Sequence, residues 1–160
     1  MLNVVQGPWR KVGTTVESPL LGHVDIGHDQ ILEFREAIAG FPGCRRYALL
    51  PYHQSGRVDP DMQWLQALEA PFHTFLVTDV WSADPDYAPD IHDADADLIG
   101  VSSFEDIALY AIVTVSRETN ELTANMRAPL MVRRDVLTAR QIMLRNGALY
   151  DARHRLCDLP

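Results

Sequence analysis

The chain has 160 residues, of which 47% are apolar and 22% are charged, and its formal net charge is −8. This composition excludes a fully disordered chain, and the absence of a long apolar run predicts no membrane span. The first ten residues lack a charged head followed by an apolar stretch, so we expect no export signal and a cytoplasmic protein.

The N-terminal half contains several short apolar segments. Residues 29–39 are ambiguous, because a helical stripe and a strand over 31–34 fit them equally well. A strand is predicted over 45–50, a two-turn helix over 61–69, and a second strand over 72–80 that leads into an acidic loop.

The C-terminal half is dominated by strand signals. The segment 107–116 (IALYAIVTVS) is apolar on both alternating faces, which predicts a central strand covered on both sides. A turn is expected at 118–121 and a hairpin turn at 146–147, where Asn-Gly tolerates positive φ. Further strands are expected over 122–126, 130–134 and 138–145. The fold class is therefore all-β: a single domain, residues 1–160, forming a small antiparallel β-barrel or a sandwich, with one or two short helices.

Charge is distributed unevenly along the chain. Residues 79–106 hold nine Asp and Glu side chains and no Lys or Arg, whereas residues 123–160 hold seven Arg and three Asp. The acidic segment disfavours direct nucleic-acid binding and favours a basic protein partner. Two plainer readings stay open, in which the acids form a solvated loop and the arginines pair with acids of the same domain.

Motifs for catalysis are scarce. The sequence contains no complete nucleophile elbow, no phosphate-binding glycine loop, and no metal-ligand spacing among its histidines or between Cys44 and Cys157. No cofactor is therefore expected, and a binding protein is favoured over an enzyme. The alternative enzyme hypothesis is a divalent-metal site at Asp90, His92, Asp93 and Asp95.

Three blocks together resemble one known family. They are ILEFREAIAGF (31–41) with YALL (47–50); WLQALEAP (64–71) with FLV (75–77) and PDYAPDI (85–91); and AIVTV (111–115) with TANMRAPLMV (123–132), ARQIML (139–144) and RHRL (153–156). In this order and at these spacings they are similar to the FliW family of flagellar assembly factors, over about residues 12–156.

The resemblance implies a β-barrel without catalytic activity that binds two proteins in the cytoplasm. One is flagellin, and the other is CsrA, a dimeric RNA-binding protein that represses flagellin translation. Capture of CsrA relieves that repression, newly made flagellin competes for the factor, and the factor also acts as a chaperone for flagellin. No membrane or nucleic acid takes part, and the free protein is expected to be a monomer. A generic protein-interaction barrel is the alternative.

Three sets of candidate residues follow, and for each residue plain packing is the competing explanation. The acidic arc is expected to face CsrA. An apolar groove is expected to take an amphipathic flagellin helix. A third set has a structural role in the family motifs. The acidic arc is Asp84, Asp86, Asp90, Asp93, Asp95 and Asp97; the apolar groove is Phe34, Ile38, Phe41, Tyr87, Met126 and Met131; the motif residues are Trp64, Gln66, Asn125 and Pro129.

The sequence departs from the family pattern at two places. Arg35, Ala37 and Ala39 stand where the family has a proline, a glycine and a second proline, and Arg133 stands where it often has Asn. The first departure leaves the conformation of the loop over 34–41, and with it the choice of partner, open.

Overall fold

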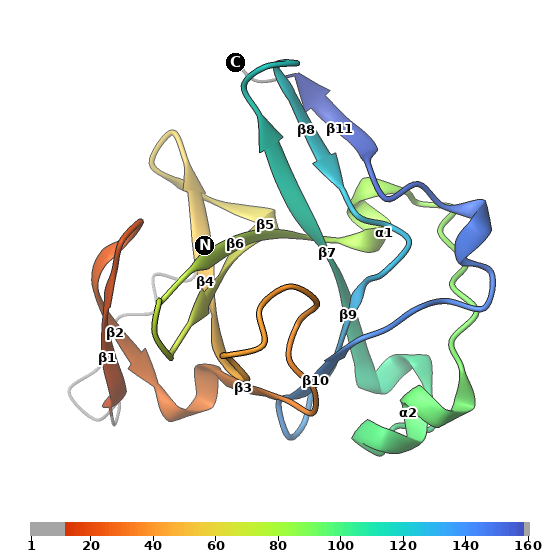
Figure 1. Cartoon of the computed structure of the whole chain (residues 1–160), viewed down its shortest axis with the longest axis horizontal. Helices are drawn as coiled ribbons and strands as arrows, with labels where there is room; N and C mark the ends of the chain where they lie inside the picture. Colours follow the sequence, from red (N-terminus) through yellow and green to blue (C-terminus); the bar gives the residue numbers. More distant parts are fainter. Residues whose placement is uncertain (1–11, 159–160) are drawn as a thin grey trace.

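Seven strands of the computed structural model, which describes residues 12–158, close into a barrel (Figure 1). Around the barrel the order is β7-β6-β5-β4-β3-β10-β9, and β9 pairs back onto β7 through the registers Ile107↔Arg133 to Tyr110↔Leu130. The described strands are β1 (Val12–Ser18), β2 (Gly22–Gly27), β3 (Ile31–Phe34), β4 (Arg46–Gln54), β5 (Arg57–Ala67), β6 (Thr74–Asp79), β7 (Ile107–Ser116), β8 (Glu121–Ala124), β9 (Leu130–Arg133), β10 (Thr138–Gln141) and β11 (His154–Asp158).

Helical structure in the described chain is short. The α-helices are α1 (Val80–Ala83) and α2 (Asp93–Ile99), and 3-10 turns lie at His28–Gln30, Phe104–Asp106 and Gly147–Leu149. Between residues 12 and 158 there is no helix long and apolar enough to cross a membrane. The residues on which the export expectation depends, Met1 to Arg10, lie outside the described part.

Two additions flank the barrel. Strands β8 and β11 continue the sheet from the far end of β7 and project as an arm at the top of Figure 1. The β1–β2 hairpin is a separate sheet, and its Val16 and Ile26 pack against Ala48 and Leu50 of β4. The all-β barrel prediction is confirmed, with one parallel pairing, β3 with β10, among otherwise antiparallel pairs.

The core forms on both faces of the central strand β7. Leu109, Ala111 and Val113 join one apolar cluster, whereas Ala108 points to the other, which contains Tyr47 and Leu65. Alternate side chains of a strand leave opposite faces, so a strand covered on both faces must be apolar throughout. The predicted central strand, 107–116, coincides with β7.

Other strand predictions are confirmed with shifted ends. The 72–80 segment contains β6, the ambiguous 31–34 segment is β3, and the turn before β8 lies where it was expected. Strand β4 continues through Pro51 to Gln54, because the register shifts between Pro51 and His53 and such an irregularity tolerates proline.

The predicted helix over 61–69 is wrong. Residues 57–67 form β5, which pairs with β4 on one side and β6 on the other. Its apolar residues face both ways: Leu65 enters one core cluster, whereas Met62 packs against the other. Long-range strand pairing therefore overrides a local spacing that also suits a helix.

The strand over 138–145 ends early, and the hairpin expected at 146–147 is absent. Strand β10 stops at Gln141, and Asn146 has φ −94 and precedes a 3-10 turn. The Asn146 side chain instead donates to the Ala88 carbonyl (2.8 Å) and accepts from the Asp90 amide (2.9 Å). These long-range bonds fix the local conformation in place of a tight turn.

Candidate functional site

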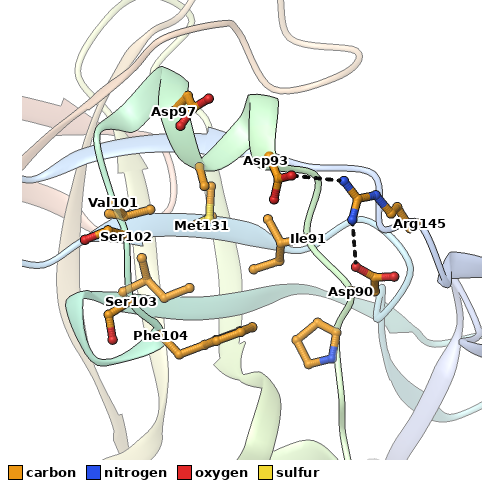
Figure 2. Close-up of a pocket in the computed structure, with 13 residues that line it drawn as sticks. Asp90, Ile91, Asp93, Asp97, Val101, Ser102, Ser103, Phe104, Met131 and Arg145 are labelled. Carbon is orange, nitrogen blue, oxygen red and sulfur yellow. Dashed lines mark hydrogen bonds and ion pairs between the residues drawn. The ribbon is translucent and has the colours of Figure 1, made fainter.

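An open hollow of about 490 Å³ lies beside helix α2 (Figure 2). Its walls come from the segment before α2, from α2 itself, from the link to β7, and from two residues of the C-terminal third, Met131 and Arg145. Segments far apart in sequence therefore meet here because β9 pairs directly with β7.

The floor of the hollow is apolar. Ile91, Val101, Phe104, Ile107 and Met131 line it. Met131 is fully buried at the edge of the core, whereas Phe104 is 55% exposed beside the opening. The part of the floor that is open to solvent, chiefly Phe104, is suited to covering by a partner.

The rim of the hollow is acidic. Asp90, Asp93 and Asp97 line it, and all three are exposed, with the Asp93 side chain 93% exposed. Asp97 forms no ion pair with any residue between 12 and 158. The same is true of Asp86, an exposed acid of this segment that does not line the hollow. The rim therefore presents negative charge directly to solvent.

Local capping builds this segment. Asp79 accepts hydrogen bonds from the amides of Trp81 and Ser82, both at 3.0 Å, and so starts α1. Helix α2 carries acids in its first turn, where the helix dipole favours them, and Gly100 caps its C-terminal end. Gly100 has φ 72, a left-handed conformation that glycine adopts without strain.

Arginines of the C-terminal third hold α2 along its length. Arg133 donates from Nη1 to the Ile99 carbonyl (3.3 Å) at the helix end. Arg140 places Nε 2.9 Å from Asp95 Oδ1 and Nη1 3.1 Å from Glu36 Oε1. The reading in which the arginines pair within the domain is thus confirmed at several positions.

Arg145 lies at the rim and is bound more loosely. Its Nη1 is 3.4 Å from Asp90 Oδ1, its Nη2 is 3.7 Å from Asp93 Oδ2, and its Nε donates to His92 Nδ1 (3.2 Å). Figure 2 shows its guanidinium between the two carboxylates at the edge of the hollow. Exposed pairs at such distances are worth at most about 1 kcal/mol each.

The structure brings together half of the acidic arc. Asp90, Asp93 and Asp97 surround the hollow, as described above. Asp84 instead accepts from the Asp86 amide (3.0 Å) in a local turn, and Asp95 is only 14% exposed against Arg140. Asp84 and Asp95 therefore serve the fold of the segment.

The apolar groove is not formed as one surface by its six residues. Phe34 and Ile38 are buried in one core cluster, and Tyr87, Met126 and Met131 are buried in the other. Of the six, only Met131 lines the hollow, and Phe41 is the one that is exposed. Burial explains this placement, because these side chains mostly hold the barrel together. Their proposed contact with flagellin stays a prediction.

Tyr87 links the acidic segment to the core. Its hydroxyl donates to the Met126 carbonyl (2.8 Å), and its own carbonyl accepts from the Trp81 indole nitrogen (3.0 Å). Burial raises the pKa of Tyr87 well above its ordinary value, so the hydroxyl stays protonated and keeps donating.

Gln66 and Trp64 have structural positions on β5. Gln66 is fully buried, its Nε2 donates to the Ala67 carbonyl (2.9 Å) and the Phe72 carbonyl (3.0 Å), and its Oε1 accepts from the Thr74 hydroxyl (2.6 Å). It thereby satisfies the backbone of the turn between β5 and β6. Trp64 lies on β5 and packs against two of the core clusters.

Asn125 and Pro129 shape the link from β8 to β9. The Asn125 Oδ1 accepts from the amides of Arg127 and Ala128, both at 3.2 Å. The carbonyl of Pro129 accepts from the Ile142 amide (2.9 Å). The link lets the chain leave β8 and rejoin the same edge of β7 as strand β9.

The divalent-metal alternative is not supported. Within residues 12–158 there is no group of three or more His, Cys, Asp or Glu residues that could hold a metal. Asp90, His92 and Asp93 contact Arg145, and Asp95 pairs with Arg140, so all four suggested ligands are already engaged by an arginine.

The loop over 34–41, where the sequence departs from the family pattern, is well anchored although it lacks the two prolines of that pattern. Ile38 is buried, the Arg35 amide donates to the Ala139 carbonyl (2.9 Å), and the Ala39 amide donates to Gln141 Oε1 (3.0 Å). Arg35 lines a second hollow of about 460 Å³ together with Arg45, Arg46, Glu33, Phe34, Glu69 and Thr138.

The floor and rim residues that sequence reasoning missed include Ile91, Val101, Phe104, Ile107 and Arg145. The excess of arginine after residue 123 signalled intramolecular pairing, but spacing alone could not say which arginine meets which acid. Phe104 carried a weak signal as an aromatic side chain within the acidic segment 79–106.

Comparisons with known proteins agree on one family. Residues 15–156 match the family described as FliW protein. Flagellar assembly factor FliW of Pseudothermotoga lettingae is 31% identical over 139 residues, covering 86% of this chain and 85% of that protein. Flagellar assembly factor FliW of Thermotoga neapolitana is 31% identical over 144 residues, covering 89% and 93%. A crystal structure of the flagellar assembly factor FliW superimposes with a TM-score of 0.76 at 26% identity, covering 92% of this chain and 98% of that one.

Proposed function

The chain belongs to the FliW family of flagellar assembly factors, and from this premise we propose that it alternately binds a CsrA-type RNA-binding regulator and flagellin. Capture of the regulator relieves repression of flagellin translation, and binding of flagellin protects the new subunit and releases the regulator. The protein works in the cytoplasm by forming complexes, without a catalysed reaction.

The observation that carries the regulator half of the proposal is the acidic rim around an apolar floor. A protein that binds RNA presents clustered Arg and Lys side chains. Such a basic surface can bind the three carboxylates of Asp90, Asp93 and Asp97. These carboxylates surround a floor that an apolar side chain can cover. The same charges repel the RNA phosphates that compete for the regulator.

Alternation follows if both partners use one hollow. A flagellin segment with an amphipathic helix would cover apolar surface, and the exposed Phe104 lines the hollow together with Met131 and Val101 of the floor. A regulator held at the rim and a helix lying on the floor cannot occupy the hollow together. Mutual exclusion then needs no movement of the barrel.

The test is calorimetry with the regulator and flagellin of the same cell. We expect the Asp93→Asn, Asp97→Asn double variant to capture the regulator more slowly and with a weaker salt dependence, because steering by the rim is reduced. Asp95 is left unchanged because it pairs with Arg140.

The matched control is the Glu33→Gln, Glu118→Gln double variant, which removes the same charge at exposed positions outside the hollow. Equal kinetics for the two double variants would refute the rim as the regulator surface. Failure of the unaltered protein to bind either partner would refute the partner switch and leave a generic interaction barrel.

A further inference from the structure

The acidic hollow already holds a cation of its own chain. We propose that the Arg145 guanidinium occupies the subsite that a basic side chain of a partner would take, so that Arg145 competes with the partner for Asp90 and Asp93. This inference rests on the proposed capture of a basic protein, and it concerns what limits the affinity of that capture.

The position of Arg145 does not depend on its side chain alone. Its backbone amide donates to the Asp90 carbonyl (2.9 Å), and the neighbouring Asn146 side chain bonds to the backbone of residues 88 and 90. The segment therefore stays tied when the guanidinium leaves. The guanidinium itself is divided among Asp90, Asp93 and His92, at 3.4, 3.7 and 3.2 Å.

Exposure makes this cation exchangeable. The Arg145 side chain is 45% exposed, and its two carboxylate partners are 51% and 93% exposed. Water can therefore replace each contact, and an incoming cation can take the place of Arg145 with little loss. The displaced guanidinium remains solvated at the edge of the hollow.

Arg140 shows the opposite arrangement on the same segment. Its side chain is 17% exposed, and its Nε and Nη1 atoms are buried between Asp95 and Glu36. Removal of that cation would leave Asp95, whose side chain is 14% exposed, without its partner. Arg140 is thus a structural cation, and Arg145 is an exchangeable one.

An exchangeable internal cation sets a threshold for binding. A partner that brings one positive charge only replaces one equivalent pair by another and gains little. A partner with several clustered cations replaces Arg145 and also engages Asp97, which has no ion pair with any described residue. Arg145 therefore favours highly basic surfaces over ordinary ones by opposing the weaker binders.

The test uses a four-arginine peptide and, separately, the CsrA-type regulator, each titrated at low salt. We expect Arg145→Gln to bind both about two- to five-fold more tightly than the unaltered protein, and the gain to vanish at high salt. Arg145→Lys retains the charge and should bind like the unaltered protein. Arg153→Gln removes the same charge at an exposed position outside the hollow and should give a smaller gain.

The inference is overturned if Arg145→Gln binds the peptide no better than Arg153→Gln does, if it binds more weakly than the unaltered protein, or if it shows no measurable binding. The peptide separates this inference from the proposed function. Failure of the regulator to bind any variant counts against the regulator half of that function, while the peptide series still decides the role of Arg145.

Discussion

The barrel and the acidic segment at 79–106 are held by different forces. Barrel strands are joined by continuous ladders and by buried apolar side chains such as Leu109, Leu65 and Leu130. In α2 and the residues just before it, only Ile99 is buried, and arginines hold much of the rest through ion pairs and carbonyl contacts. Apolar burial does not depend on charge screening, whereas exposed ion pairs are weakened by it.

This difference teaches where binding can occur without endangering the fold. At the hollow, the Arg145 contacts are ones that water or a partner's cation can replace, whereas the buried apolar contacts of the barrel are not. The molecule can therefore exchange partners at one surface while its scaffold stays intact. Five predictions test this division, in decreasing order of expected effect.

Leu109→Ala should give the largest loss of stability, because Leu109 is fully buried in the core and the change leaves a cavity. We expect the free energy of unfolding to fall by about 2–5 kcal/mol, with little dependence on salt, in urea denaturation. Leu149→Ala is the control, because Leu149 is 78% exposed. Equal losses in the two variants would break the comparison.

Gln66→Leu should lower the free energy of unfolding by about 1–3 kcal/mol, because the carbonyls of Ala67 and Phe72 lose their donor and the Thr74 hydroxyl loses its acceptor. Urea denaturation measures the loss. A change within experimental error would show that water satisfies this turn, and that Gln66 is not needed by the barrel.

Arg140→Gln should lower stability by about 1–2 kcal/mol, because Asp95 and Glu36 lose a buried partner. Arg145→Gln should change it by less than about 1 kcal/mol, because its pairs are exposed. Thermal melts of both variants at matched salt make the comparison. If the order of the two losses is reversed, the assignment of structural and exchangeable cations is wrong.

Acidification should weaken the barrel at His73. Burial lowers the pKa of His73 below its ordinary value of 6.5, while its Nε2 is 2.9 Å from the Tyr47 hydroxyl. The unfolded chain then takes up the proton first, so the stability due to this group is complete above pH 6.5 and falls as the pH drops below that value.

The measurement for His73 is urea denaturation between pH 7.5 and 5.5, with His73→Gln as the variant in which this slope should shrink. His23 acts in the opposite direction, because its hydrogen bond to Glu17 raises its pKa, and both proteins share that contribution. Identical slopes in the two proteins would contradict the expectation.

Asp97→Asn should have the smallest effect on folding, a change within about 0.5 kcal/mol, because the side chain is exposed and forms no ion pair with residues 12–158. Thermal melts check this. A larger loss would mean that the rim supports the fold, and would move the acidic segment to the structural side of the comparison.

Much of the fold was predictable where the chain is apolar on both faces or resembles known blocks. The 107–116 segment shows this, because a strand buried on both sides has no polar face to confuse the pattern. The 61–69 segment was misread because its spacing suits a helix as well as a strand, and only pairing with β4 and β6 decides between them.

The candidate site was predictable in its charge and less so in its membership. The acidic run marked the correct segment, but the sequence could not separate Asp97, which faces solvent at the hollow, from Asp95 two residues earlier, which turns to Arg140. Methionines and aromatics such as Met126 suited a groove and a core equally well, and burial assigned Met126 to the core.

The sequence by itself determined the all-β class, the family, the central strand and the sign of the charge at the site, since these depend on composition and on short-range patterns. Only the tertiary structure decided which acids stay free, which arginine holds α2 and which lies across the hollow. Those outcomes depend on the pairing of β9 with β7, which joins residues twenty or more positions apart, and such long-range contacts leave no local trace in the chain.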